Sequence, residues 1–191
     1  MKAHAANRFE NFIAAWTPDN TDICDKLIAY HQSTPDKGPG TRGGVLDLSM
    51  KNSIDCNIRD TVLQQEYHSY LEQVTNKYCE LYPACTRFSP WAVVEPINIQ
   101  YYQPGGGYYA WHTERTDSAM PGAARTLVFM TYLNTVTDGG ETEWFHQKLK
   151  IRPERGLTVI WPADWCFAHR GITSNTQEKY IVTGWFSYLA R

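Results

Sequence analysis

Residues 102–114 read Tyr-Gln-Pro-Gly-Gly-Gly-Tyr-Tyr-Ala-Trp-His-Thr-Glu. The Pro-Gly-Gly-Gly run is typical of a turn, and the residues on either side of it alternate as strands do. We therefore expect residues 93–102 and 108–114 to form two strands joined by this turn. On the second strand, His112 and Glu114 are two positions apart and would point to the same face. An imidazole and a carboxylate would then meet at one place.

Further strands are indicated on both sides of this hairpin. Residues 126–134, 156–161 and 179–188 are rich in Val, Ile, Thr and aromatic residues, which favour strands. A short strand is also expected over residues 45–50. Several short strands separated by turn residues are typical of a β-sandwich or jelly roll.

Helical patterns come only in the first part of the chain. Apolar residues recur at helical spacing near residues 23–30 and over 58–81. Because the helices precede the strands, we expect a mainly β fold of the α+β type, a jelly-roll core with N-terminal supporting helices. The prediction is a single domain over residues 1–191, with a helical part over about 1–85 and the jelly roll over about 90–191.

The composition excludes several classes of protein. Of the 191 residues, 42% are hydrophobic and 14% aromatic, enough to bury a core, so a disordered chain is excluded. A net charge of −2 makes nucleic acid an unlikely partner. No apolar run reaches the ~20 residues that span a membrane, and no signal peptide is apparent, so we expect a cytoplasmic protein without membrane contact. The cysteines are odd in number and scattered, which indicates reduced thiols: Cys24, Cys56, Cys79, Cys85 and Cys166.

His169 can supply a third ligand beside His112 and Glu114. Two histidines and one carboxylate form the facial triad of non-haem Fe(II) oxygenases, which leaves coordination positions open for co-substrate and dioxygen. A His-x-Glu pattern alone is weak support for a metal site, because such pairs are common.

Lys179 adds to this pattern. If the last strand alternates, Lys179, Ile181, Thr183 and Trp185 share one face. A lysine on an inward face is costly unless a negative partner neutralises it, and a ligand carboxylate would do so. The alternative is that the strand faces the other way and Lys179 is solvated.

From about Pro96 to Tyr188 the chain resembles the Fe(II)- and 2-oxoglutarate-dependent dioxygenases, specifically their prolyl 4-hydroxylase-like branch. No single motif carries the resemblance, but several occur in order with fitting spacing. They are the stretch 102–114, Arg125-Thr126, Tyr132-Leu133-Asn134, Gly139-Gly140-Glu141-Thr142, Pro153-x-x-Gly156, His169, Lys179 and Trp185.

The resemblance implies a double-stranded β-helix with Fe(II) bound by His112, Glu114 and His169, which act in catalysis through the iron. It implies that Lys179 pairs with the distal carboxylate of 2-oxoglutarate. Tyr102 and Tyr132 would hydrogen-bond this co-substrate, and Thr183 and Trp185 would line its pocket. Ordinary aromatic packing is the alternative for Tyr102, Tyr132 and Trp185.

One position departs from the family pattern. Glu114 stands where the family usually has Asp, so its extra methylene moves the carboxylate outward and the strand or rotamer must adjust. Since some members of the wider superfamily use His-x-Glu, the ligand assignment stands.

The implied reaction is hydroxylation of a C–H bond, first of a prolyl or other residue in a protein or peptide. Dioxygen is consumed, and 2-oxoglutarate is decarboxylated to succinate and CO2. Ascorbate assists some relatives, and its role here is open, as is the oligomeric state. The loops 37–57 and 115–124 are candidate substrate lids.

Four other functions stay open or are disfavoured. The same fold could oxidise a free amino acid or other small molecule. A cupin-like metal- or ligand-binding module without oxygenase turnover, or a structural jelly roll with a chance motif, would share the barrel. A nucleic-acid demethylase is disfavoured, because that group typically has arginines at the positions of Lys179 and Trp185.

Overall fold

The computed structural model describes residues 1–115 and 119–189. It has two α-helices, α1 (Ile23–Ser33) and α2 (Thr61–Leu81), and four short 3-10 helices (Phe9–Asn11, Pro83–Thr86, Gly122–Ala124 and Trp165–Phe167). The strands are β1 (Lys2–Ala3), β2 (Ala14–Thr17), β3 (Lys37–Pro39), β4 (Lys51–Asn52), β5 (Ile54–Asn57), β6 (Trp91–Ala92), β7 (Asn98–Tyr102), β8 (Gly107–Tyr108), β9 (Arg125–Tyr132), β10 (Thr142–Trp144), β11 (Leu149–Ile151), β12 (Thr158–Pro162), β13 (His169–Gly171) and β14 (Lys179–Tyr188).

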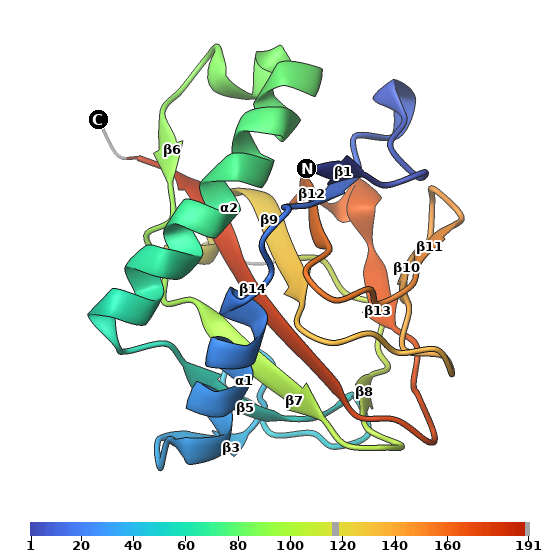
Figure 1. The fold of residues 1–191 in the computed structure, drawn as a ribbon. Helices are drawn as coiled ribbons and strands as arrows, with labels where there is room; N and C mark the ends of the chain where they lie inside the picture. The colour runs from blue at the N-terminus through green and yellow to red at the C-terminus, as the bar shows by residue number, and fades with distance from the viewer. Residues whose placement is uncertain (116–118, 190–191) are drawn as a thin grey trace.

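The strands pair antiparallel in a large sheet and two small ones. The large sheet has the order β1-β2-β12-β9-β14-β7-β5-β3, with β6 added beside β14. The order β11-β10-β13 makes a three-stranded sheet, and β4 pairs with β8. In Figure 1 the helices α1 and α2 lie against one face of the large sheet, and the small sheet of β10, β11 and β13 lies on the other side. The mainly β fold with N-terminal helices is therefore confirmed.

Alternation along β9 divides the interior into two cores. Leu127 and Phe129 pack with the helices, whereas Val128, Met130 and Tyr132 pack toward the small sheet. This period of two is the property of any strand. The helices thus cover one face of the large sheet, and the other face is turned toward the small sheet.

The longer helix is positioned by a cap and by its apolar stripe. The Asp60 carboxylate accepts a hydrogen bond from the Leu63 N–H at 2.9 Å and so satisfies one of the free donors of the first turn. Within the stripe, the Tyr67 hydroxyl reaches Thr131 on β9, with 2.8 Å between the two oxygens. In the described part of the chain, neither helix combines the length and apolarity needed to cross a bilayer.

Three sequence-based boundaries are wrong. The strand expected over 108–114 shrinks to β8, because the N–H groups of Tyr109 and Ala110 turn to the carbonyl of Met50. Of the strand expected over 93–102, only the second half forms, as β7 (Asn98–Tyr102), because β6 has already ended at Ala92. The region 37–57, expected as a loop around one strand at 45–50, instead holds β3, β4 and β5. The strands β3 and β5 pair with each other, and β5 and β4 also pair with β7 and β8 further along the chain.

The five cysteines carry free thiols, as expected. Cys24 and Cys56 are buried, and burial raises the pKa of each thiol to about 11. The sulfur atoms of Cys79 and Cys85 lie 3.7 Å apart where α2 ends.

Candidate functional site

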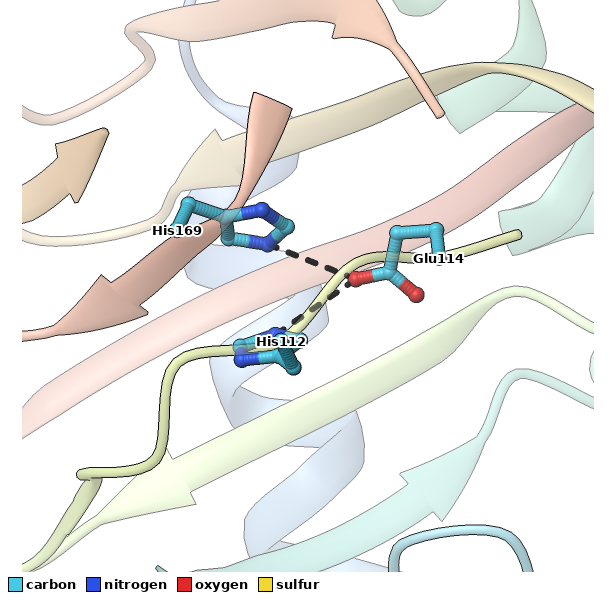
Figure 2. Close-up of side chains that lie close together, drawn as sticks. All are labelled: His112, Glu114 and His169. Atoms are coloured by element: carbon cyan, nitrogen blue, oxygen red, sulfur yellow. Dashed lines mark ion pairs between the residues drawn. The ribbon is translucent and has the colours of Figure 1, made fainter. Parts of the chain in front are cut away.

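The two histidines of the sequence motif lie opposite each other on neighbouring segments. The His112 N–H donates to the His169 carbonyl at 3.0 Å, and the His169 N–H donates to the His112 carbonyl at 2.9 Å. This exchange is the closely bonded pair of an antiparallel ladder. It fixes both side chains on the same side of the backbone, and Glu114 reaches the same point from two residues further on (Figure 2).

Each imidazole is oriented by a backbone carbonyl. The Nδ1–H of His112 donates to the Ala110 carbonyl at 2.9 Å, and that of His169 donates to the Phe167 carbonyl at 3.0 Å. In a neutral ring the opposite nitrogen, Nε2, is then an acceptor with a free lone pair. Burial, and secondly the nearby His169, lower the pKa of His112 to about 3, so its ring is neutral.

Glu114 completes the cluster as a carboxylate. Its Oε1 lies 3.4 Å from Nε2 of His169 and 3.6 Å from Nε2 of His112. Burial alone would raise its pKa, but the adjacent imidazole of His169, and then His112 and Arg125, together lower it to about 2. Glu114 therefore stays ionised across the physiological range.

The cluster fits a divalent cation. One ligand atom from each of the three residues lies within 4.8 Å of the others. Two imidazole lone pairs and a carboxylate oxygen are all acceptors, and a metal ion at their centre would satisfy all three. Nitrogen and oxygen donors in this ratio suit Fe(II) with open positions for other ligands.

A second layer of side chains holds Glu114 from behind. The indole N–H of Trp185 donates to Oε2 of Glu114 at 2.9 Å. The guanidinium of Arg125 stacks 3.5 Å from the Trp185 ring, donates to the Glu114 carbonyl at 3.0 Å, and binds both carboxylate oxygens of Glu95. Trp185 was expected to line the cavity, which it does, but its hydrogen bond to Glu114 and the role of Glu95 were missed. Only the Arg125-Thr126 motif pointed toward this layer.

Lys179 lines the same cavity, and no carboxylate among the described residues contacts it. The residue is 5% exposed, and its ammonium donates to the carbonyl of Gly140 at 3.0 Å. It lies 4.9 Å from the centre of the Tyr102 ring. Burial lowers the pKa of Lys179 to about 8, although the charge of Glu141 opposes this shift. The expectation of an inward lysine is therefore confirmed, and the solvated alternative is wrong.

One cavity of about 680 Å³ contains the metal cluster and most of the expected pocket residues. Lys179, Ile181, Thr183 and Trp185 all line it, as the alternation of β14 predicted. Tyr102 lines it too, with its hydroxyl donating to Gln100 at 2.6 Å. The hydroxyl of Thr183 donates to the Phe129 carbonyl at 3.2 Å.

Tyr132 is placed differently from the other expected pocket residues. It is fully buried, and its hydroxyl bonds Thr142 at 2.7 Å and the Ile151 carbonyl at 3.1 Å. Thr142 rather than Tyr132 lines the cavity. Any effect of Tyr132 on a ligand would therefore pass through Thr142.

The candidate lids are described only in part. The 37–57 region contributes several cavity-lining residues, among them Arg42 and Asp55. In the 115–124 loop, residues 116–118 lie outside the described residues, and 119–122 line the cavity.

Two histidines and a carboxylate that can hold one metal ion lie between two antiparallel sheets. This combination is typical of metal-binding proteins with the double-stranded β-helix fold. Residues 97–187 match the family model described as the 2OG-Fe(II) oxygenase superfamily. The matched region, slightly less than half of the chain, is similar to this superfamily, whose members are 2-oxoglutarate-dependent dioxygenases that use Fe(II) and dioxygen.

Solved structures share the fold across nearly the whole chain. A viral collagen prolyl hydroxylase from Paramecium bursaria Chlorella virus-1, in complex with 2OG, is 19% identical with a TM-score of 0.69, covering 94% of this chain and 97% of that one. A Pseudomonas putida prolyl-4-hydroxylase is 15% identical with a TM-score of 0.71, covering 93% of each chain.

A prolyl hydroxylase from Trichoplax adhaerens, solved with a peptide fragment of a hypoxia inducible factor degradation domain, has 13% identity and a TM-score of 0.72. The match covers 93% of this chain and 84% of that one. Comparison with curated protein sequences gives no match. At these identities the structural likeness establishes the fold and leaves the substrate open.

Proposed function

We propose that this dioxygenase hydroxylates a C–H bond of a prolyl residue in a peptide or protein. The observation that carries the oxygenase part is one cavity that holds both the His112–Glu114–His169 cluster and Lys179, whose ammonium bonds a backbone carbonyl but no described carboxylate. The prolyl part is supported by the matching structures, which are prolyl hydroxylases.

Each group of residues at the site would have a separate role. His112, Glu114 and His169 would hold the iron, which supplies the oxidising chemistry when 2-oxoglutarate and dioxygen are bound. Lys179 would pair with the distal carboxylate of 2-oxoglutarate, because a buried ammonium without a carboxylate needs such a partner. Tyr102 and Thr183 would shape the walls around the co-substrate.

The test is turnover of defined peptides. Purified protein with Fe(II) and 2-oxoglutarate is incubated with proline-containing peptides and with matched peptides in which alanine replaces proline. We expect succinate formation and a mass gain of one oxygen atom only on the proline peptides. The His112→Ala variant is the control and should give neither product. Turnover of 2-oxoglutarate without any oxidised prolyl peptide would leave the oxygenase class intact and reject the prolyl substrate.

A further inference from the structure

Arg42 is presented to the cavity by a tight hairpin. Its N–H and carbonyl both pair with Val45, at 2.9 and 3.0 Å, across a two-residue turn. Gly43 and Gly44 in that turn have φ of +55° and +80°, the left-handed values that such turns require. Just before the hairpin, a Cβ on Gly40 would lie 2.2 Å from the Ser53 hydroxyl. The backbone at Gly40 therefore packs directly against Ser53. Together with the two hydrogen bonds to Val45, this contact fixes the position of the Arg42 backbone.

Arg42 differs from the other cations of the cavity. Among the described lining residues, Lys179 bonds a carbonyl and four other cations have a carboxylate within 4.0 Å. These four pairs are Lys51 with Asp55, Arg59 with Asp36, Arg125 with Glu95 and Arg170 with Glu143. Within residues 1–115 and 119–189, the one hydrogen bond of the Arg42 guanidinium goes to the sulfur of Met50, at 3.7 Å. An arginine fork is suited to a carboxylate, and no described residue supplies one here.

The wall near Arg42 is polar as well. On the cavity side of β5 and β7, Asp55 lies opposite Gln100, and Asn57 lies opposite Asn98. The Oδ1 atom of Asn98 is buried and has no hydrogen-bond partner. A wall of one carboxylate and three amides, with one unsatisfied acceptor, suits a polar ligand better than a purely apolar one.

We propose that Arg42 is a substrate-specificity residue that binds a carboxylate group of the substrate. The inference rests on the proposed function, because it assumes a substrate that enters the cavity beside the metal cluster. Lys179 accounts for the co-substrate, so Arg42 is the remaining cation for a second anion. The carboxylate could come from an acidic side chain next to the target residue, or from the α-carboxylate of a free or C-terminal residue.

Binding of small probes tests this without knowing the natural substrate. In the anaerobic complex with Fe(II) and 2-oxoglutarate, affinities are measured by calorimetry for two isosteric pairs. N-acetyl-L-proline is compared with N-acetyl-L-prolinamide, and acetyl-Pro-Asp-amide with acetyl-Pro-Asn-amide. The variants are Arg42→Gln, Arg42→Lys and, as a matched control, Arg59→Gln, which removes a cavity cation that already has a carboxylate neighbour.

We expect the wild type to prefer a carboxylate probe over its amide by about tenfold, as one charge-assisted pair allows. Arg42→Gln should abolish that preference, Arg42→Lys should keep part of it, and Arg59→Gln should keep it. A preference in the first pair indicates an α-carboxylate, and one in the second pair an acidic side chain. Equal affinities within both pairs, absence of binding by all four probes, or a preference that survives in Arg42→Gln would overturn the proposal.

The visible Fe(II)–2-oxoglutarate charge-transfer band separates this failure from failure of the proposed function. If the band forms in the wild type and in Arg42→Gln while the probes show no carboxylate preference, only the role of Arg42 is rejected. If the wild type forms no band with iron bound, the co-substrate site itself is rejected.

Discussion

At the scale of single residues, the site depends on how the carboxylate of Glu114 is held. One oxygen faces the two imidazoles, and the other accepts the indole N–H of Trp185 at 2.9 Å. Glutamate has one methylene more than the usual aspartate, and this hydrogen bond removes the freedom that the longer side chain would otherwise have. Outer partners of this kind orient a metal ligand before the metal binds.

Trp185→Phe should weaken metal binding while leaving the fold intact. The ring is kept, but Oε2 of Glu114 loses its donor, so we expect a loss of about 10–100-fold in affinity for Fe(II) or Mn(II). Calorimetric titration of the apoprotein measures this change. Thr183→Ala, which alters the cavity wall without touching Glu114, is the control. Equal metal affinities for Trp185→Phe and the wild type would contradict the positioning role.

The affinity for 2-oxoglutarate should fall as the pH rises through about 8. Burial lowers the pKa of Lys179 to about 8, against the opposing charge of Glu141, and only the protonated amine can pair with a carboxylate. Below this pH the lysine is already charged, so the affinity should level off there. The charge-transfer band, titrated anaerobically across a pH series, measures the affinity.

Lys179→Arg provides the control for this pH dependence. A guanidinium remains charged throughout the series, so the alkaline loss should disappear if the variant binds 2-oxoglutarate. A wild-type affinity that does not change on the alkaline side would remove Lys179 from the co-substrate site.

At the scale of elements, β14 is the central strand because it pairs with β7 on one side and β9 on the other. Its residues facing the small sheet line the cavity, and its other face packs against the helices. Gly184 lies on that second face, opposite Phe129 of β9. A Cβ added to Gly184 would lie 2.3 Å from the Phe129 ring.

Gly184→Ala should therefore destabilise the protein without altering the site directly. Displacement of the buried Phe129 ring is expected to cost about 1–3 kcal/mol, which lowers Tm by about 2–4 °C for each kcal/mol. Thermal unfolding measures the change. The matched control is Gly38→Ala, because a Cβ there meets nothing within 4 Å. A Tm for Gly184→Ala equal to that of the control would show that the Phe129 ring can move aside at no cost.

Much of this could be predicted from the sequence, but only where a pattern is local. The bounds of β14 and the apolar stripe of α2 follow from periodicity, and the metal cluster follows from a short motif with one distant histidine. Glu95 could not be found, because its partner Arg125 is 30 residues away and no spacing rule joins them. The strands β3 and β5 were missed since they are short and are held mainly by β7 and by each other.

At the scale of the whole molecule, the core packed by the helices and the metal-binding side chains lie on opposite faces of the large sheet. The core between the helices and the large sheet contains none of the metal-binding side chains, which lie on the opposite face. The two histidines are also joined by their own backbone hydrogen bonds, with no need for an ion. The fold should therefore not require the metal.

Removal of metal by a chelator should leave the protein folded. We expect an unchanged far-ultraviolet circular dichroism spectrum and a cooperative thermal transition in the apoprotein. Added Fe(II) or Mn(II) should raise the stability by mass action only, about 2.7 kcal/mol at a hundredfold excess over Kd. Loss of the cooperative transition on chelation would show instead that folding and metal binding are coupled, as they are in small zinc domains.

The paired backbones of His112 and His169 have a consequence for how the enzyme is made. A chain whose ligands are already in place can be synthesised and stored when iron is scarce, and it becomes active once iron arrives. The share of the protein in its active form would then be set by the iron concentration relative to Kd, with no refolding step in between.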